Sequence, residues 1–505
     1  ASSVRRAVQT NSRTSSGGFS PGAWTSRTRH VGRMLFIAAT VLTCLLGSER
    51  MGQAETPQRP NIILCMADDL GYGDTSYNGH PVLKTPNLDA MAAAGLRFNR
   101  FYAASAVCSP TRGSCLTGRH PSRYGITTAN AGHLKQQEVC LAEVLRERGY
   151  ATGHFGKWHL GTMTPDFSGK GAGRKPRQNY MTPGMAGFDE WFSTEYAVST
   201  WDPYDPQNAH GKCGVRAVYW RRGKNIADGE QAGLTGCDSR IVMDHALPFV
   251  EKAARDKQPF FAVIWFHAPH EPVRGGPEYL ARFAEHPEKE RHYYAVVTAL
   301  DDQLGRLRSR LRELGVADNT MLWFASDNGP EPATAPGTPA GLRERKRSLY
   351  EGGVRVPGIV EWPAKIKQPR TTDVPAVTSD YFPTVLEAVG ASTSAGSQQK
   401  HVAAGRPSDG LSLLPLFEGK AQRRAEPIAF QYQKQATLID NQYKLVTDPG
   451  LKKLELYDIA ADPAEKQNIA SAHPDVAAAM RQRLESWLQS CAASNQGEDY
   501  GRPTR

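Results

Sequence analysis

The chain has 505 residues, of which 40% are hydrophobic and 22% charged, a composition that excludes a disordered or fibrous protein and supports a substantial core. Its formal net charge of +10 would suit a polyanion-binding protein. Residues 1–54, however, hold seven arginines, no lysine and one acid, Glu49, whereas the rest carries 54 bases and 50 acids. The body is therefore only weakly basic, and we expect no nucleic-acid partner.

Residues 27–54 are typical of an export signal. Three arginines precede the apolar run at 34–47, and small residues occupy the −3 and −1 positions of a cleavage site after Ala54. Fourteen apolar residues are short for a bilayer span, which makes a permanent membrane anchor the less favoured alternative. We predict that residues 1–54 are an export segment with a basic tail, and that the protein is periplasmic or secreted.

Export to an oxidising compartment changes the meaning of the cysteines. An odd number would stay in the exported chain, so at least one is unpaired: Cys65, Cys108, Cys115, Cys140, Cys213, Cys237 and Cys491. Cys213 and Cys237 lie in polar, glycine-rich sequence, and we predict a disulfide between them. The absence of CxxC pairs disfavours a structural zinc site.

Strand-like runs alternate with helical patterns in the first part of the body. The runs at 61–69, 259–270 and 320–329 are apolar and end in polar residues, as parallel strands covered on both faces do. Helices are expected at 87–98 and 293–315, and residues 141–159 predict a helix, a glycine turn and a strand. This α/β pattern predicts a doubly wound sheet with its site at the carboxyl ends of the strands.

The pattern changes near residue 415. Residues 428–448 and 453–463 predict short antiparallel strands, and residues 474–491 predict a helix. A smaller α+β unit is therefore expected at the C-terminus. The predicted organisation is an export segment (1–54), a catalytic domain (55–415), a smaller C-terminal domain (416–495) and a flexible tail (496–505).

The most informative segment is AVCSPTRGSCLTGRHPSRYG, residues 106–125. Pro110 favours the first turn of a helix, so Cys108 would stand just before a helix N-terminus, where free backbone N–H groups attract an anion. Arg112 adds a cation one turn further on. A plainer interpretation makes Cys108 a small buried hydrophobic residue or the disulfide partner of Cys115.

This segment resembles the sulfatase signature CxPxR followed by GxxLTGR, seen here at 108–112 and 113–119, and other motifs follow in the family's order. They are ADDLGYGD (67–74), GKWHLG (156–161), HAPHEP (267–272), SDNGP (326–330), KRSLYEGGVRVP (346–357) and LYDIAADPAEKQNIA (456–470). The resemblance implies a sulfatase that hydrolyses sulfate esters. It also implies an alkaline-phosphatase-like α/β fold, with a large, mostly parallel central sheet between helices and a smaller C-terminal domain with an antiparallel sheet.

In sulfatases the cysteine at the position of Cys108 is converted after translation to Cα-formylglycine, whose aldehyde is hydrated to a gem-diol. The resemblance therefore implies this modification here, and a formylglycine-generating or other sulfatase-maturing enzyme as a partner. One hydroxyl would attack sulfur while cationic groups stabilise the sulfate oxygens and a protonated side chain protonates the departing alcohol.

Two polar pairs end two of the predicted strands, Asp68 with Asp69 and Asp327 with Asn328. Hard oxygen donors without thiolate or imidazole suit Ca²⁺ better than Zn²⁺, with Mg²⁺ as the main competitor. An Asp pair on its own is equally typical of a helix cap or a solvated turn. The resemblance assigns all four residues to the metal, together with an oxygen of modified Cys108.

The resemblance also supplies groups around the sulfate. It places Lys157 and His159 near the gem-diol and sulfate, and His270 and Lys346 near the sulfate and the leaving oxygen. His270 is preferred to His267, a predicted packing residue, because a proline follows it closely. Lys346 is assigned by counting back along the sequence from EGG. It lies in a basic run where the family often has glycines, and such a run by itself would suggest a solvated face.

The expected substrate is a sulfated carbohydrate of the N-acetylgalactosamine-6-sulfate type or a related polysaccharide, attacked at a terminal sugar. Basic loops at 162–182 and 196–225 would either line the site or simply be solvated. Two alternatives stay open. One is a phosphomonoesterase or phosphodiesterase of the alkaline-phosphatase superfamily; the other is an inactive, calcium-dependent polysaccharide-binding protein.

Overall fold

The computed structural model describes residues 59–500 except 167, 169–174, 206–218, 227–232, 333–335 and 392–405. The predicted export segment and Cys213 lie outside this part of the chain, so neither the signal nor the Cys213–Cys237 disulfide is described. From Arg59 onward the chain forms one compact unit. Among the described helices none is long and apolar enough to cross a bilayer.

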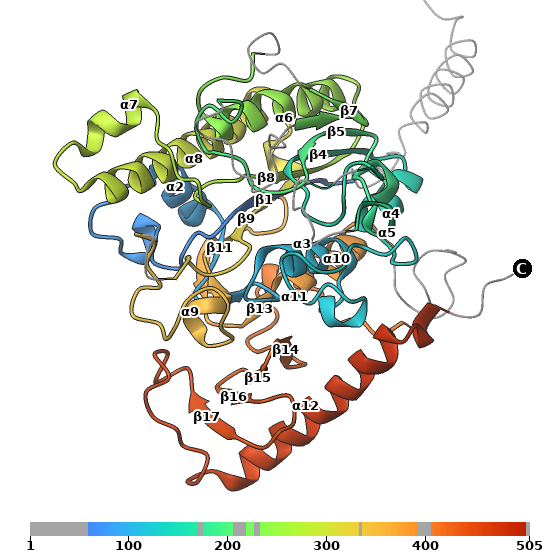
Figure 1. The fold of residues 1–505 in the computed structure, drawn as a ribbon, viewed down its shortest axis with the longest axis vertical. Helices are drawn as coiled ribbons and strands as arrows, with labels where there is room; N and C mark the ends of the chain where they lie inside the picture. The colour runs from blue at the N-terminus through green and yellow to red at the C-terminus, as the bar shows by residue number, and fades with distance from the viewer. Residues whose placement is uncertain are drawn as a thin grey trace, which may run out of the picture. The chain divides into compact units, whose positions relative to one another are not determined.

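The centre of this unit is a ten-stranded sheet in the order β12-β2-β11-β9-β1-β8-β4-β5-β6-β7 (Figure 1). Strands β9, β1, β8, β4 and β5 are mutually parallel, whereas β11 and β6 run antiparallel to these neighbours. The large, mostly parallel sheet is therefore confirmed. Its strands are β1 (Asn61–Ala67), β2 (Leu96–Phe98), β4 (Ala151–Lys157), β5 (Glu190–Thr194), β6 (Tyr219–Arg221), β7 (Lys224–Asn225), β8 (Phe260–Trp265), β9 (Thr320–Ser326), β11 (Gly358–Glu361) and β12 (Arg370–Thr372).

Helices cover both faces of this sheet because alternate apolar side chains of each strand point to opposite sides. In β1, Ile62 and Leu64 join one core cluster, and Ile63 and Cys65 join another. The first cluster is completed by α3 (Cys108–Thr117), α4 (Leu141–Glu147), α10 (Tyr381–Ala388) and α11 (Leu414–Phe417). The second is completed by α2 (Pro86–Ala94), α6 (Asp238–Arg255) and α8 (Glu288–Glu313).

The helix expected at 87–98 ends at Ala94, and the last residues of that segment form strand β2 instead. A Cβ on Gly95 would lie 2.2 Å from the carbonyl oxygen of Val360, so glycine permits a close approach to β11. Beyond it, Leu96 and Arg97 pair with β11 and β12. Pairing with strands distant in sequence therefore overrides the helical pattern.

The C-terminal segment forms the expected antiparallel sheet, made of β14 (Ile428–Tyr432), β15 (Gln435–Asp440), β16 (Tyr443–Thr447) and β17 (Leu454–Asp458). One face packs on α12 (Pro474–Asn495) through Leu438, Leu445 and Leu484. The other face packs on the body, where Phe430 meets Tyr102. The domain boundary near residue 415 stays a prediction.

A buried ion cluster ties this sheet to the body. Lys444 Nζ of β16 lies 2.9 Å from Glu351 Oε1 and 2.9 Å from Glu465 Oε1. Tyr102 donates its hydroxyl hydrogen to Glu351 over 3.0 Å. Glu351 begins α9 (Glu351–Val354), and the remaining short elements are α5 (Pro176–Asn179), α7 (Pro277–Leu280), β3 (Phe101–Tyr102), β10 (Arg355–Val356) and β13 (Ala376–Val377).

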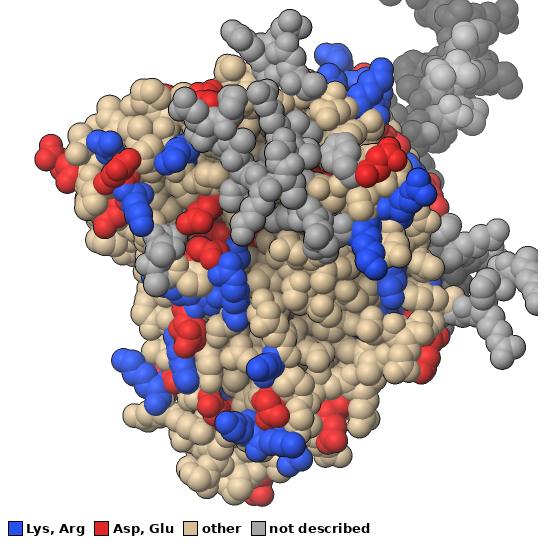
Figure 2. Space-filling view, in the orientation of Figure 1, with Lys and Arg blue, Asp and Glu red and all other residues tan. Residues whose placement is uncertain are grey.

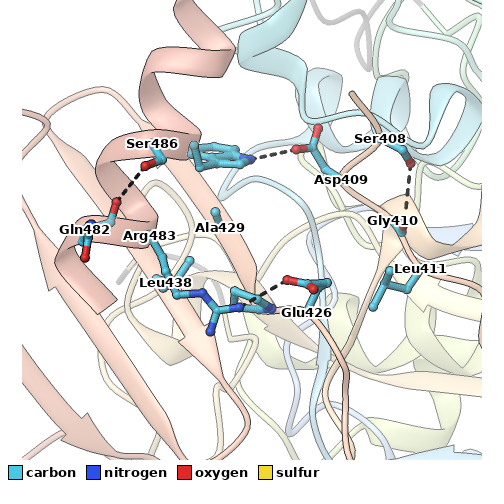
Figure 3. Close-up of a pocket in the computed structure, with 12 residues that line it drawn as sticks. Ser408, Asp409, Gly410, Leu411, Glu426, Ala429, Leu438, Gln482, Arg483 and Ser486 are labelled. Carbon is cyan, nitrogen blue, oxygen red and sulfur yellow. Dashed lines mark hydrogen bonds and ion pairs between the residues drawn. The ribbon is translucent and has the colours of Figure 1, made fainter. Parts of the chain in front are cut away.

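A cavity of about 470 Å³ lies between α12 and the start of β14 (Figure 3). On its walls, Trp487 Nε1 donates to Asp409 Oδ1 over 2.7 Å, and Arg483 lies 3.2 Å from Glu426. None of the site residues expected from the sequence lines it. Figure 2 shows basic and acidic side chains interspersed over the face that it draws, as the small net charge of the body predicts.

Candidate active site

The two polar pairs meet at the carboxyl edge of the sheet. Strands β1 and β9 are adjacent and parallel, with Ala67 opposite Ser326, so the residues that follow them emerge side by side. Asn328 Nδ2 donates to Asp69 Oδ1 over 2.7 Å, and the backbone N–H of Asp69 donates to Asp327 Oδ1 over 3.2 Å. The structure thus brings together the residues assigned to a metal.

Cys108 is the first residue of α3, with Val107 as its N-cap, and its side chain is buried. Its sulfur and one oxygen each of Asp68 and Asp327 lie within 4.8 Å of one another. Both Cys108 and Cys115 are free thiols, so the disulfide alternative is wrong. The helix N-terminus therefore presents Cys108 to the carboxylates.

Arg112 lies one turn further along α3 and is completely buried. Its Nη2 is 2.6 Å from Asp327 Oδ2 and 3.6 Å from Asp68 Oδ2. Its Nη1 donates to the backbone carbonyl of Lys157 over 3.0 Å. This guanidinium therefore fixes a metal-site carboxylate and the end of β4 at the same time.

Strand β4 ends at Lys157, whose Nζ lies 2.5 Å from Asp68 Oδ2. Two residues on, His159 has a left-handed backbone (φ 54°), and its carbonyl accepts a hydrogen bond of 2.6 Å from the hydroxyl of Ser109. Because Ser109 follows Cys108, this bond joins the end of β4 to the first turn of α3. The end of β4 therefore lies next to the first turn of α3, while the predicted roles of Lys157 and His159 stay predictions.

The basic run from 343 to 347 places only one ammonium group against the metal-site carboxylates. Lys346 Nζ lies 2.6 Å from Asp69 Oδ1 and 2.9 Å from Glu331 Oε2, and its side chain is 4% exposed. The sequence reasoning missed Glu331; the only signal is an acid directly after SDNGP. Glu331 also lies 2.5 Å from Arg347, so it holds two cations at once.

The two histidines of HAPHEP lie in different surroundings. His270 Nε2 is 3.7 Å from Asp69 Oδ2, and its side chain is 17% exposed. Burial lowers the pKa of His270 to about 3, against the pull of the nearby carboxylates. His267 is fully buried, 2.8 Å from Asp238 and 2.7 Å from Thr194 Oγ1. Only His270 therefore reaches the carboxylate cluster.

The carboxylates of the site feel opposing effects. Burial by itself would raise the pKa of Asp68, but nearby positive charge, led by Lys157, holds it well below the usual range. The pKa of Asp69 is likewise lowered against burial, chiefly by Lys346. For Asp327, burial and the neighbouring charge of Asp68 raise the pKa to about 7. The three carboxylates therefore lie beside three cationic side chains, those of Arg112, Lys157 and Lys346.

Two buried oxygens show what the cluster is suited to hold. Asp68 Oδ1 and Asn328 Oδ1 accept no hydrogen bond from the protein, although each is shielded from solvent. An unsatisfied buried polar atom is costly unless a ligand meets it. Carboxylate and amide oxygens are ligands that a hard divalent cation prefers. The residues therefore fit the metal expected from the sequence.

For Arg221 and Arg222 in the basic loop at 196–225, the structure favours the solvated alternative, since their side chains are 59% and 63% exposed. Arg221 and Arg222 pair with Glu190, which begins β5, whereas Lys157 lies at the other end of the adjacent parallel strand β4. These two arginines therefore lie away from the carboxyl edge of the sheet. Lys170 and Arg174 of the other loop lie outside the described residues.

Comparisons with known proteins agree with this arrangement. Residues 60–391 match the sulfatase family model, and residues 344–490 match the model described as N-sulphoglucosamine sulphohydrolase, C-terminal. N-acetylgalactosamine-6-sulfatase of Canis lupus familiaris is 33% identical over 400 residues, covering 75% of this chain and 70% of that protein. Arylsulfatase A of Homo sapiens is 32% identical over 470 residues, covering 84% of this chain and 86% of that protein.

A solved structure shares the whole architecture. The crystal structure of Ps i-CgsB in complex with k-i-k-neocarrahexaose superposes with a TM-score of 0.72 and 26% identity, covering 88% of this chain and 98% of that one. The family model covers more than half of the chain, and the relatives above exceed 30% identity over most of their length. The chain therefore belongs to the sulfatase family and is a hydrolase of sulfate esters.

Proposed function

We propose that this sulfatase desulfates saccharides with a formylglycine formed from Cys108 and a bound Ca²⁺. The observation that carries the proposal is the position of Cys108. Its sulfur stands within 4.8 Å of carboxylate oxygens of Asp68 and Asp327, at the N-terminus of a helix and at the carboxyl edge of the sheet. Among the described residues, Cys108 is buried but belongs to none of the hydrophobic clusters of the core.

Asp68, Asp69, Asp327 and Asn328 would hold the cation, together with an oxygen of modified Cys108. A bound divalent cation supplies positive charge to a sulfate oxygen and favours the ionised form of a nucleophilic hydroxyl. Arg112 keeps Asp327 in place through its contact of 2.6 Å. Mg²⁺ is the competing ion, because it takes the same hard oxygen ligands.

The cationic side chains would bind the sulfate. Lys157 and Lys346 contact Asp68 and Asp69, so both ammonium groups lie beside the carboxylates at which the sulfate would bind. His270 is the most exposed of the predicted catalytic side chains, at 17%, and so faces the side from which substrate enters. We assign His270 and Lys346 to the leaving oxygen, and Lys157 and His159 to the attacking side.

The substrate class rests on the relatives. One is named N-acetylgalactosamine-6-sulfatase, and the solved structure named above holds a neocarrahexaose. We extend saccharide sulfates to this chain, with attack at a terminal sugar. Residues 27–54 would direct the protein to the periplasm or outside the cell, and a sulfatase-maturing enzyme would modify Cys108.

A phosphoesterase of the same fold is the main alternative, but that chemistry uses a serine or threonine hydroxyl with two zinc ions, whereas Cys108 heads α3. An inactive polysaccharide-binding protein is disfavoured because Arg112, Lys157 and Lys346 all contact the carboxylate cluster near Cys108. Mass spectrometry of the peptide containing residue 108 tests the proposal, together with desulfation of defined 4-O-, 6-O- and N-sulfated saccharides. Formylglycine and sulfate release are expected; an unmodified thiol in an active preparation would refute the formylglycine assignment.

A further inference from the structure

The residue after Lys346 has a role that sulfate binding does not explain. Arg347 has a left-handed backbone (φ 75°), a conformation that favours glycine and strains a longer side chain. Its backbone N–H donates to the carbonyl of Ala106 over 2.9 Å, two residues before Cys108. The arginine is therefore fixed at the border of the active site despite an unfavourable backbone.

The guanidinium of Arg347 lies close to Lys346. Glu331 accepts Arg347 Nη1 on Oε1 at 2.5 Å and Lys346 Nζ on Oε2 at 2.9 Å. Because both cations bind one carboxylate, their nitrogens are no more than about 8 Å apart. Neighbouring substituents of one sugar ring, or groups across one glycosidic bond, span such a distance. An anion beside the scissile sulfate would therefore come within reach of Arg347.

Unlike Lys346, Arg347 keeps donors for a ligand. Its side chain is 51% exposed, against 4% for Lys346, and Glu331 is bound through Nη1. A guanidinium has five N–H donors in a planar fork that matches a carboxylate or a sulfate. The segment of Arg347 lies next to the turn between β14 and β15, because the backbone N–H of Leu349, two residues further on, donates to Gln435 Oε1 over 2.8 Å.

We propose that Arg347 is a specificity residue, which binds a second oxyanion of the substrate next to the sulfate to be cleaved. The inference rests on the proposed function and narrows it to saccharides with two neighbouring anionic groups. The second group is either another sulfate or the carboxylate of an adjoining uronic acid. Both present oxygens that a guanidinium binds in the same way.

The test uses the matured full chain with p-nitrophenyl sulfate as the reporter substrate. Three competing ligands are compared by their inhibition constants. They are N-acetylgalactosamine-6-sulfate, N-acetylgalactosamine-4,6-disulfate, and N-acetylgalactosamine-6-sulfate linked through its reducing end to glucuronate. The wild-type protein should bind at least one of the two doubly anionic compounds more tightly than the singly anionic one. Tighter binding of the disulfate would identify the second anionic group as a sulfate, and tighter binding of the glucuronate compound would identify it as a carboxylate.

Arg347→Gly should reduce that preference by about 10-fold to 100-fold, the usual effect of losing a charge-assisted hydrogen bond. Arg347→Lys should restore part of it. Arg222→Gly is the matched control, because Arg222 also has a left-handed backbone (φ 47°), pairs with a glutamate and is 63% exposed, but lies away from the site. The control should keep the wild-type preference.

Two results overturn the inference separately from the proposed function. Hydrolysis of the reporter without preference for either doubly anionic compound would refute the role of Arg347, as would a preference that Arg347→Gly leaves intact. Failure of the wild-type protein, with formylglycine present, to hydrolyse any sulfate ester would instead refute the proposed function, and this inference with it.

Discussion

Asn328 and Asp69 are 259 residues apart in sequence, yet Asn328 Nδ2 donates to Asp69 Oδ1 over 2.7 Å. The same amide leaves its own Oδ1 buried without a hydrogen-bond donor. The bond therefore orients an acceptor toward the carboxylate cluster, where a cation would meet it. Two strand ends form half of the site each, and neither half is complete alone.

Removal of the metal should lower both stability and activity. Ca²⁺ at 100 times its dissociation constant would stabilise the fold by about 2.7 kcal/mol, so chelation should lower the melting temperature. Adding back Ca²⁺ should restore it more fully than Mg²⁺. Asn328→Ala should abolish most of the calcium-dependent shift, which thermal melts with and without chelator would measure. Equal melting temperatures in the wild-type protein would contradict the metal assignment.

Replacement of Cys108 should abolish catalysis without unfolding the protein. Cys108→Ser removes the residue that is converted to the aldehyde, and we expect sulfatase activity to fall at least about 10³-fold. Cys115→Ala is the control, because Cys115 is a buried thiol of the same helix that packs in the core. Turnover of p-nitrophenyl sulfate measures both. Parental activity in Cys108→Ser would be incompatible with the formylglycine nucleophile.

The two histidines of HAPHEP should separate into one that acts on substrate and one that supports the fold. His270→Ala should lower kcat by about 10² to 10⁴ with little change in melting temperature, since His270 is partly exposed at the carboxylates. His267→Ala should destabilise the protein by about 2 kcal/mol or more, because it removes one buried hydrogen-bond partner each from Asp238 Oδ2 and Thr194 Oγ1. The opposite pattern would reverse the assignment.

The ion cluster at the C-terminal sheet should contribute to global stability. Lys444→Met would leave Glu351 and Glu465 buried without their shared cation, at a cost of about 3 kcal/mol or more. Lys420→Met is the control, because Lys420 pairs with Glu418 at the surface and its side chain is 73% exposed. Urea unfolding should show little change for the control. A Lys444→Met protein as stable as the wild type would refute the role of the cluster.

Three central strands, β1, β8 and β9, could be predicted, since each is a local apolar run with polar residues after it. The pairing of β1 with β9 could not be read from the sequence, because hydrogen bonding between strands 259 residues apart depends on topology. For the same reason Leu96–Phe98 was assigned to a helix, although it pairs with β11 and β12. Local periodicity carries no information about such partners.

The site residues could be named from motifs, but their contacts could not. Glu331 bears no pattern of its own, and only the fold shows that it bridges Lys346 and Arg347. The sequence could not decide whether the basic loop at 196–225 lines the site. Arg221 and Arg222 pair with Glu190 at the start of β5 and line a cavity with Ala151 at the start of β4. Residue types in the motifs therefore indicated the chemistry of the site, whereas the positions of the side chains depend on contacts between residues far apart in the sequence.

The burial of Cys108 has a consequence for the order of its modification and the folding of the chain. Its side chain is 2% exposed, and the neighbouring Ser109 and Arg112 bind the end of β4 through backbone carbonyls. The folded protein shields this thiol from any enzyme that would modify it. We therefore expect the modification of Cys108 to precede the docking of α3. A chain that folds first would keep an unmodified thiol and would be inactive.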